Sequence, residues 1–342
     1  MAPHPSLAEI LHSGTLISMK KDTLLLGWGE KQTFSIPKDP AFFLTDFFLQ
    51  KKPCWFTHKY MREISVEDAK KIFKQENTNL KPLEWIPFFK EPFFKTIENV
   101  KELIKAGRLH KAVPYVFERC LETMGPSRLS SSLSQALRYI ESYPCYLYGT
   151  WSHAQGLLGV TPEILFQKKL NNITTFALAG TASNHLLENK KNHHEHRIVI
   201  EGIQESLAPF GKFKTGPTYT LNLSKLKHLK TEMQLSLSEN LEFEQIARVL
   251  HPTPALGAYP KKEGMGWLKE YDQKCPRLYY GAPIGFRQKE EEICYVAIRN
   301  VQWTDQMMFM GAGCGIVKDS QPDEEWDEIQ LKIRSIKEML AL

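Results

Sequence analysis

Apolar residues recur along the chain at two spacings, one typical of helices and one typical of strands. Helical spacing predicts helices over 93–104, 133–140, about 186–208 and about 322–340. Short apolar runs predict strands over 110–116, 145–151, 156–160, 173–178, 278–285, 293–301 and 307–310. Helices and strands therefore share the chain from residue 93 onwards.

The first 85 residues alternate short apolar runs with polar breaks, and three prolines then interrupt the pattern. Pro82, Pro87 and Pro92 lie too close together for a continuous helix or a central strand. We therefore expect a connector there, which divides the chain into an N-terminal portion, 1–85, and a larger domain, 86–342.

The composition is that of an ordinary globular protein and excludes several classes. With 342 residues, 42% of them hydrophobic and 24% charged, the chain can bury a core. The apolar stretch 41–49 contains Asp46 and is too short to span a membrane, and residues 1–7 lack the apolar segment of a signal peptide, so we expect a cytoplasmic protein with no membrane partner. Six cysteines without a CxxC pair predict reduced thiols.

The net charge of +5 is too small to indicate a nucleic-acid partner. The basic runs are short and dispersed, as at Lys190 and Lys191. We interpret most of them as solvated faces.

The last predicted helix carries charged residues beside its apolar stripe. At about 100° per residue, Glu325, Glu328 and Lys332 fall on a flank next to the buried face. Taken alone, the pattern favours an exposed i,i+4 pair of Glu328 and Lys332 that is of little consequence. The local pattern leaves both interpretations open.

Residues 190–196 read KKNHHEH, which suggests a metal site. Adjacent side chains on a helix point about 100° apart, so the three histidines and Glu195 cannot converge on one ion, and the HExxH spacing of zinc enzymes is absent. Glu195 alone could supply an oxygen ligand to Mg²⁺, which usually takes one or two carboxylates with water and substrate oxygens. A solvated helix face is the other interpretation.

The glycines of 311–315 (GAGCG) could be mistaken for a dinucleotide-binding loop. That fingerprint must open a helix, whereas 316–320 is predicted to continue extended, which argues against such a site. The glycines instead offer backbone amides that a carboxylate can approach closely.

Taken in order, these segments resemble the chorismate-utilising enzymes, a family that includes isochorismate synthase, salicylate synthase, anthranilate synthase component I and aminodeoxychorismate synthase component I. The motifs are GVTPE at 159–163, ALAGT at 177–181, EH at 195–196, HPTPA at 251–255, YYGAPIG at 279–285, VAIR at 296–299, GCGIV at 313–317 and EWDE at 325–328 with Lys332. The resemblance covers about residues 100–340. It implies an α+β fold in which two large antiparallel sheets pack on one another with helices outside, 86–342 being the chorismate-binding catalytic domain.

The resemblance also implies a reaction. Lys111 stands where members that add water carry a lysine and members that add ammonia carry glutamine. A lysine acts as a base only when neutral, a form that desolvation or neighbouring cations favour. Ala179 stands where the aminodeoxychorismate synthases resembling this chain carry a nucleophilic lysine, which disfavours covalent amine capture. The chain is most similar to the menaquinone-type isochorismate synthases, which are isomerases. The resemblance implies that Glu163 would protonate the departing C4 hydroxyl of chorismate while Lys111 takes a proton from the water attacking C2.

The resemblance implies the ligands as well. Residues expected to contact chorismate are Thr181, His251, Tyr280, Arg299, Gly313, Gly315 and Lys332. Mg²⁺ is the expected cofactor, held by Glu195 and Glu328, with Glu325 binding a metal-bound water. No glutamine amidotransferase subunit is expected. A salicylate synthase, which also eliminates pyruvate, and a non-catalytic chorismate-binding protein are the alternatives, and a catechol siderophore is the alternative to menaquinone as the end product.

Overall fold

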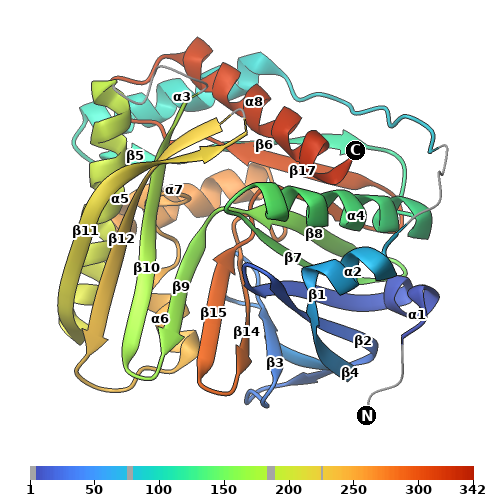
Figure 1. The fold of residues 1–342 in the computed structure, drawn as a ribbon. Helices are drawn as coiled ribbons and strands as arrows, with labels where there is room; N and C mark the ends of the chain where they lie inside the picture. Colours follow the sequence, from blue (N-terminus) through green and yellow to red (C-terminus); the bar gives the residue numbers. More distant parts are fainter. Residues whose placement is uncertain (1–4, 75–79, 183–188, 225) are drawn as a thin grey trace.

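An antiparallel, 15-stranded sheet is the framework of the computed structural model, which describes residues 5–74, 80–182, 189–224 and 226–342 (Figure 1). In pairing order the strands are β11 (Gly211–Leu223), β12 (Leu226–Leu237), β10 (Asn172–Ala182), β9 (Ile164–Lys169), β15 (Glu291–Val296), β14 (Pro283–Gln288), β3 (Ala41–Leu44), β4 (Trp55–Ser65), β2 (Thr23–Phe34), β1 (Ser13–Lys20), β7 (Tyr146–Ser152), β8 (Gly156–Thr161), β16 (Asn300–Trp303), β17 (Met308–Gly313) and β6 (Tyr115–Cys120). A separate pair joins β5 (Lys111–Ala112) to β13 (Ala258–Tyr259).

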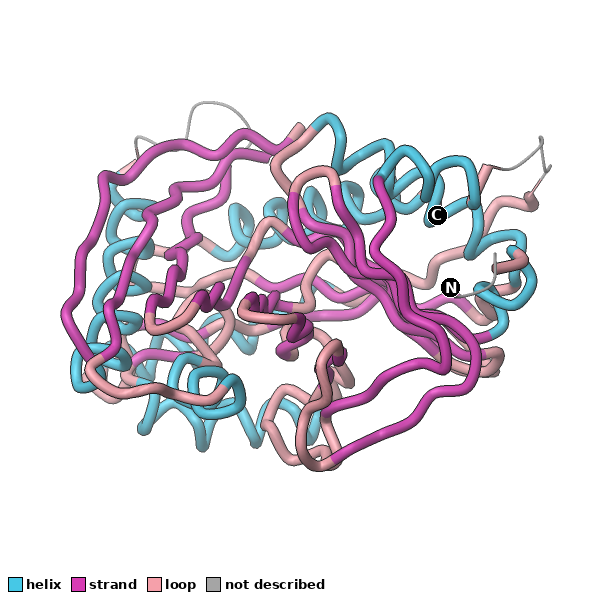
Figure 2. The backbone as a smooth tube through the Cα atoms, turned by 60° about the horizontal axis from the view of Figure 1, so that its bottom comes forward, coloured by secondary structure: helices cyan, strands magenta, loops and turns pink. Residues whose placement is uncertain are grey.

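The two halves of this sheet pack on one another. One apolar cluster contains Ile17 of β1 and Tyr148 of β7 from one half, together with Ile284 of β14 and Tyr295 of β15 from the other. The tube in Figure 2 shows both halves of the sheet, with helices outside them. This arrangement confirms the predicted α+β class. Hydrogen bonds between β14 and β3 join the two expected sheets into one continuous sheet.

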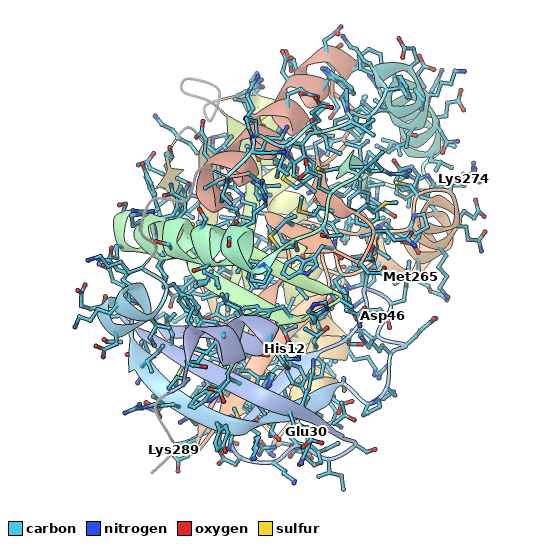
Figure 3. The ribbon with its side chains drawn as sticks, turned by 90° about the vertical axis from the view of Figure 1, so that its right-hand side faces the viewer. His12, Glu30, Asp46, Met265, Lys274 and Lys289 are labelled. Carbon is cyan, nitrogen blue, oxygen red and sulfur yellow. The ribbon has the colours of Figure 1, made fainter. Side chains whose placement is uncertain are left out.

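Helices cover the outer faces of both halves. The helices α1 (Leu7–His12), α2 (Val66–Ile72), α3 (Lys90–Lys105), α4 (Pro126–Ser142) and α8 (Pro322–Leu340) share one apolar cluster with β1, β2 and β7. On the other half, α5 (Lys190–Leu207) and α6 (Phe243–Leu250) share a second cluster with β9, β10 and β12. A 3₁₀ turn (Ala208–Phe210) follows α5, and α7 (Lys261–Lys274) contacts β13. Side chains fill the space between these layers, and Lys274 and Lys289 lie at the periphery (Figure 3).

Local sequence fixes the first turns of α5 and α8. The side chain of Asn189 accepts a hydrogen bond of 3.0 Å from the backbone N–H of Lys191, which caps α5. Pro322 opens α8, where its missing N–H costs nothing, and the acidic residues 323–325 favour the positive end of the helix dipole. These two turns carry several of the residues singled out from the sequence.

Two predicted strands are each divided by one residue. The strand expected over 110–116 separates into β5 and β6 because Pro114 has no N–H to donate. The strand expected over 293–301 separates into β15 and β16, and Arg299 between them has a positive φ of 54°. Both interruptions lie at the ends of strands that carry site residues.

Other predicted boundaries shift. The strand expected over 278–285 begins only at Pro283, after a turn in which the N–H of Tyr280 donates to the carbonyl of Arg277. The helix expected over 186–208 begins at Lys190, and 183–188 lies outside the described residues.

The N-terminal residues belong to the same sheet, with β1 to β4 in central places. In the expected connector, Ile86 pairs with Arg119, and α3 begins at Lys90 with Pro92 in its first turn. The division at 85/86 remains a prediction. None of the described helices combines the length and apolar character needed to cross a membrane.

Candidate active site

A cavity beside the first turns of α5 and α8 brings most of the predicted site residues together. Its lining includes Glu163, Thr181, Glu195, Tyr280, Arg299, Gly313, Gly315, Glu328 and Lys332. Lys111 and Glu325 are fully buried next to this lining, through contacts with Glu195 and Lys191. Ala179 also lines the cavity, where its methyl group offers no nucleophile.

Lys111 and Glu195 form a buried ion pair. The Nζ atom of Lys111 lies 2.9 Å from Oε1 of Glu195. Burial acts to raise the pKa of Glu195, but the cations of Lys111 and Lys191 lower it below its ordinary value. The backbone of Gly315 passes directly over the pair, because a Cβ there would collide with Oε1 of Glu195 and Cε of Lys111.

Glu163 supplies a buried carboxyl group at the end of β8. Burial raises its pKa to about 7, against the opposing effects of Lys111, Lys332 and Arg299. Its backbone N–H donates to Oγ1 of Thr161, which fixes the turn that carries it. A carboxyl group with this pKa can hold a proton near neutral pH and donate it, as a general acid must.

Arg299 is held by a histidine that we did not single out from the sequence. Its Nη2 donates to Nε2 of His228 across 2.6 Å, while its buried Nη1 has no hydrogen-bond partner among the described residues. Because Nε2 accepts, Nδ1 carries the proton and faces Oγ1 of Thr181 at 3.3 Å. Burial lowers the pKa of His228 well below its ordinary value, which keeps the ring neutral. Its neighbours in β12 are Lys227 and Leu229, so no distinctive local motif pointed to this histidine.

Lys332 and Glu328 lie in the cavity wall, which excludes the exposed-pair interpretation. The Nζ atom of Lys332 is 2.6 Å from Oε1 of Glu328 and donates to the carbonyl of Gly313 across 2.7 Å. Burial acts to lower the pKa of Lys332, but the charge of Glu328 raises it above its ordinary value.

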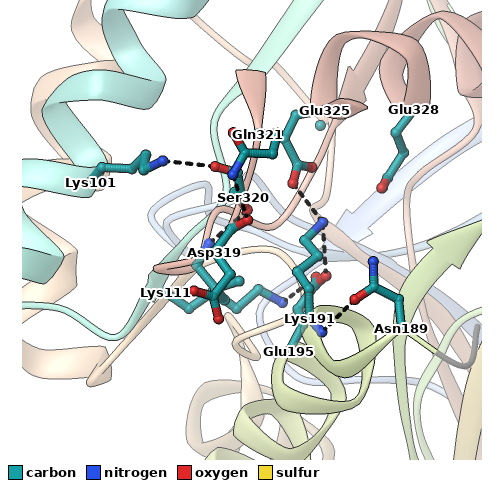
Figure 4. A network of polar contacts seen from close by, with 12 residues as sticks. Lys101, Lys111, Asn189, Lys191, Glu195, Asp319, Ser320, Gln321, Glu325 and Glu328 are labelled. Carbon is teal, nitrogen blue, oxygen red and sulfur yellow. Dashed lines mark hydrogen bonds and ion pairs between the residues drawn. The ribbon is translucent and has the colours of Figure 1, made fainter. Parts of the chain in front are cut away.

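Lys191 lies between two carboxylates that were expected to serve a metal (Figure 4). Its Nζ is 2.6 Å from Oε1 of Glu325 and 3.9 Å from Oε2 of Glu195. Our expectation of a solvated face holds for Lys190, which is exposed, and is wrong for Lys191. Lys191 precedes Glu195 by four residues and therefore shares its helix face. Burial raises the pKa of Glu325 to about 7, with Lys191 opposing.

The structure does not bring His251 into the cavity lining. Its Nε2 lies 2.7 Å from the carbonyl oxygen of Phe47, and its ring packs edge-on against the Phe47 ring. The turn that presents Phe47 is closed by Asp46, whose carboxylate accepts from the N–H of Phe48. From the HPTPA motif, Ala255 lines the cavity instead, and the histidine there is His228.

The donor chemistry around α5 and α8 fits a hard cation. Glu195 and Glu328 line the cavity, and Oε2 of the fully buried Glu325 has no hydrogen-bond partner among the described residues. In the described ranges, however, no three His, Cys, Asp or Glu side chains are arranged as a ready-made metal site. His193 and His194 are exposed, whereas Glu195 is buried. The carboxylates are paired with lysines instead.

Comparison with known proteins identifies the family. The model of the family described as "Chorismate binding enzyme" matches residues 54–341, and the chain therefore belongs to the chorismate-binding enzymes. The chain is 31% identical over 199 residues to the "Salicylate biosynthesis isochorismate synthase" of Pseudomonas aeruginosa, covering 54% of this chain and 42% of that protein. It is 29% identical over 262 residues to isochorismate synthase MenF of Pasteurella multocida, covering 71% of this chain and 60% of that protein. The matched regions thus span about half the length of these relatives.

A solved structure supports the fold. The menaquinone-specific isochorismate synthase MenF from Escherichia coli aligns with a TM-score of 0.77 at 18% identity, covering 98% of this chain and 91% of that one. The expected fold is therefore confirmed.

Proposed function

We propose that the protein is an isochorismate synthase, which converts chorismate reversibly to isochorismate by adding water at C2 and releasing the C4 hydroxyl. One observation carries the proposal: a buried carboxyl group with a pKa of about 7, Glu163, shares its surroundings with a fully buried lysine, Lys111. An acid and a base at one cavity are what an exchange of hydroxyl groups requires. The names of the relatives support the same reaction.

Glu163 acts as the acid in the forward direction. An allylic hydroxide is a poor leaving group, and a positioned proton donor lowers the barrier to its departure. Burial keeps the proton on Glu163 near neutral pH, while Lys111, Lys332 and Arg299 limit how far its pKa rises. The proton moves from the Glu163 carboxyl to the C4 oxygen as the C4–O bond breaks.

Lys111 acts as the base. Its neutral Nζ accepts a proton from the water that attacks C2, and in the reverse reaction it returns that proton to the departing C2 hydroxyl. Its Nζ is paired with Oε1 of Glu195 at 2.9 Å, so releasing the amine to the attacking water requires the charge of Glu195 to be compensated. Bound by Glu195 and Glu328, with Glu325 behind, Mg²⁺ would supply that compensation, bind the ring carboxylate and withdraw electrons from the diene.

The remaining lining residues suit a substrate with two carboxylates. Nη1 of Arg299 has no hydrogen-bond partner among the described residues, and a planar guanidinium grips a carboxylate with two hydrogen bonds. Tyr280, Lys332 and the amides of Gly313 and Gly315 line the same cavity and complete the clamp. Thr181 orients a substrate or water oxygen.

Product analysis tests the proposal. Purified protein incubated with chorismate and MgCl₂ should yield isochorismate as the main product on chromatography. Accumulation of salicylate with pyruvate would identify a salicylate synthase, and unchanged chorismate would identify a non-catalytic binding protein. Added ammonium salt should give no aminated product.

We also propose that the isochorismate serves menaquinone biosynthesis, which the names of the MenF relatives support. Growth of a strain lacking this protein should then be restored by menaquinone. Restoration by a catechol siderophore precursor alone would contradict this role.

A further inference from the structure

Lys191 is unusual because a lysine ammonium lies where a metal ion would be expected to act. It is a first-turn residue of α5, and its Nζ contacts Glu325 of α8 at 2.6 Å and approaches Glu195 of α5 at 3.9 Å. Its side chain is 10% exposed and that of Glu325 is fully buried. The ammonium therefore joins the two helices through carboxylates that are shielded from water.

The contact has a clear electrostatic reason. Two buried carboxylates on facing helices repel one another, and a buried charge without a partner is strongly destabilising. A single cation between Glu195 and Glu325 removes both costs. A divalent ion held by Glu195 would meet the positive charge of Lys191, whose Nζ lies 3.9 Å from Oε2 of that carboxylate.

The pairing also explains why the carboxylates do not form a ready-made metal site. Glu195 has Lys111 and Lys191 as neighbours, Glu325 has Lys191, and Glu328 has Lys332. Among the described residues, no three acidic, histidine or cysteine side chains converge as metal ligands. A cation that enters must replace a lysine.

We propose that Lys191 is a built-in cation that neutralises Glu195 and Glu325 when the divalent metal is absent, and that metal binding to Glu195 displaces it. The inference rests on the proposed function, whose metal site it deepens. Lys191 is a positioning residue: it keeps α5 and α8 together when the metal is absent, and it sets metal affinity by competing for the same oxygens.

Calorimetric titration with MgCl₂ or MnCl₂, without chorismate, tests the competition. Lys191→Met removes the competing charge and should tighten metal binding by about tenfold or more. Its metal-free melting temperature should fall, because two carboxylates lose their cation, and added metal should restore it. Lys190→Met is the matched control, since Lys190 is the exposed neighbour on the same turn, and should bind metal like the wild type. Lys191→Arg keeps the charge and should bind metal no more tightly than the wild type.

Equal or weaker metal binding by Lys191→Met would overturn the proposal, because a purely structural lysine lowers stability without improving affinity. If that variant does not fold, a crystal structure of the wild type with Mn²⁺ decides the question: the ion should lie at Glu195 and Lys191 should have left. If the ion is bound while the ammonium of Lys191 still contacts Glu195 and Glu325, the proposal is contradicted.

The outcome also separates this inference from the proposed function. If the wild type makes isochorismate with Mg²⁺ but Lys191→Met does not bind metal more tightly, the proposed function stands and the inference about Lys191 fails. If the wild type makes no isochorismate, the proposed function fails, whatever the titration shows.

Discussion

Glu195 holds Lys111 as a charged partner, with Oε1 and Nζ 2.9 Å apart in a pair that is almost entirely shielded from water. While this contact holds, the amine is paired with a carboxylate and is not available to a water molecule. Activity therefore requires a change in the charge around Glu195, and this requirement links the metal to the base in the proposed mechanism.

Gly315→Ala should disable the enzyme without unfolding it. The added methyl would collide with Oε1 of Glu195 and Cε of Lys111, displacing the pair by about 1 Å, and such a misplacement can cost roughly a hundredfold in kcat. Gly266→Ala on α7 is the control, because no atom of the described residues lies within 4 Å of a Cβ added there. Steady-state rates and melting temperatures measured on both variants check this, and wild-type kcat in Gly315→Ala would contradict the geometry.

Lys111→Gln should lower the rate in both directions by roughly a hundredfold to ten-thousandfold, since the lysine moves a proton in each. Initial rates starting from chorismate and from isochorismate measure the two directions. Chorismate binding to the variant, followed by calorimetry, should remain. A variant that keeps near wild-type rates in either direction removes Lys111 from the mechanism.

Glu163 should leave a signature in stability as well as in rate. Its folded pKa is raised from 4.5 to about 7, so its contribution to stability is complete below pH 4.5 and is lost as the pH rises to about 7. That loss amounts to about 3 kcal/mol. Denaturant unfolding across this range should show a smaller pH dependence in Glu163→Gln than in the wild type. The wild-type rate should fall above pH 7 as the acid loses its proton, and a rate that rises there would contradict the assignment.

His228→Phe should weaken chorismate binding, because Arg299 loses the acceptor that orients it. Hydrogen bonds to charged groups contribute about 1.5–3 kcal/mol, so KM should increase roughly tenfold or more. His251→Gln is the contrasting variant: His251 bonds to the carbonyl of Phe47 outside the cavity lining, and its replacement should lower stability with little effect on KM. The opposite pattern would restore His251 as the substrate contact.

Glu328→Gln should raise the Mg²⁺ concentration needed for half-maximal activity by at least roughly tenfold. Glu324→Gln is the matched control, because Glu324 is exposed one turn earlier on α8. Rates measured against MgCl₂ concentration, after chelator treatment, check both variants. Equal Mg²⁺ dependence in the two would exclude Glu328 as a ligand.

Much of the site was predictable because its residues lie within ordered motifs. Glu163, Arg299 and Lys332 come from segments far apart in the sequence, and the structure brings all three to one cavity. Helical periodicity also located α8, since its apolar stripe is continuous and its first turn opens with Pro322 and the acidic residues 323–325.

The missed features depend on contacts between distant segments. No local pattern shows that Nε2 of His228 meets Arg299, because the contact arises only when β12 lies beside the loop before β16. Lys191 was interpreted as solvated because its partner Glu325 is on another helix. The strand predicted over 293–301 is divided near Arg299, where φ is positive. The apolar pattern continues through this residue and therefore does not reveal the turn of the backbone.

The most direct test of the central claim is to run the reaction in water labelled with heavy oxygen. The C2 hydroxyl of the isochorismate should carry the label, because that oxygen comes from solvent while the C4 hydroxyl departs. Isochorismate that retains only unlabelled oxygen, or a product without a new hydroxyl at C2, would contradict the account.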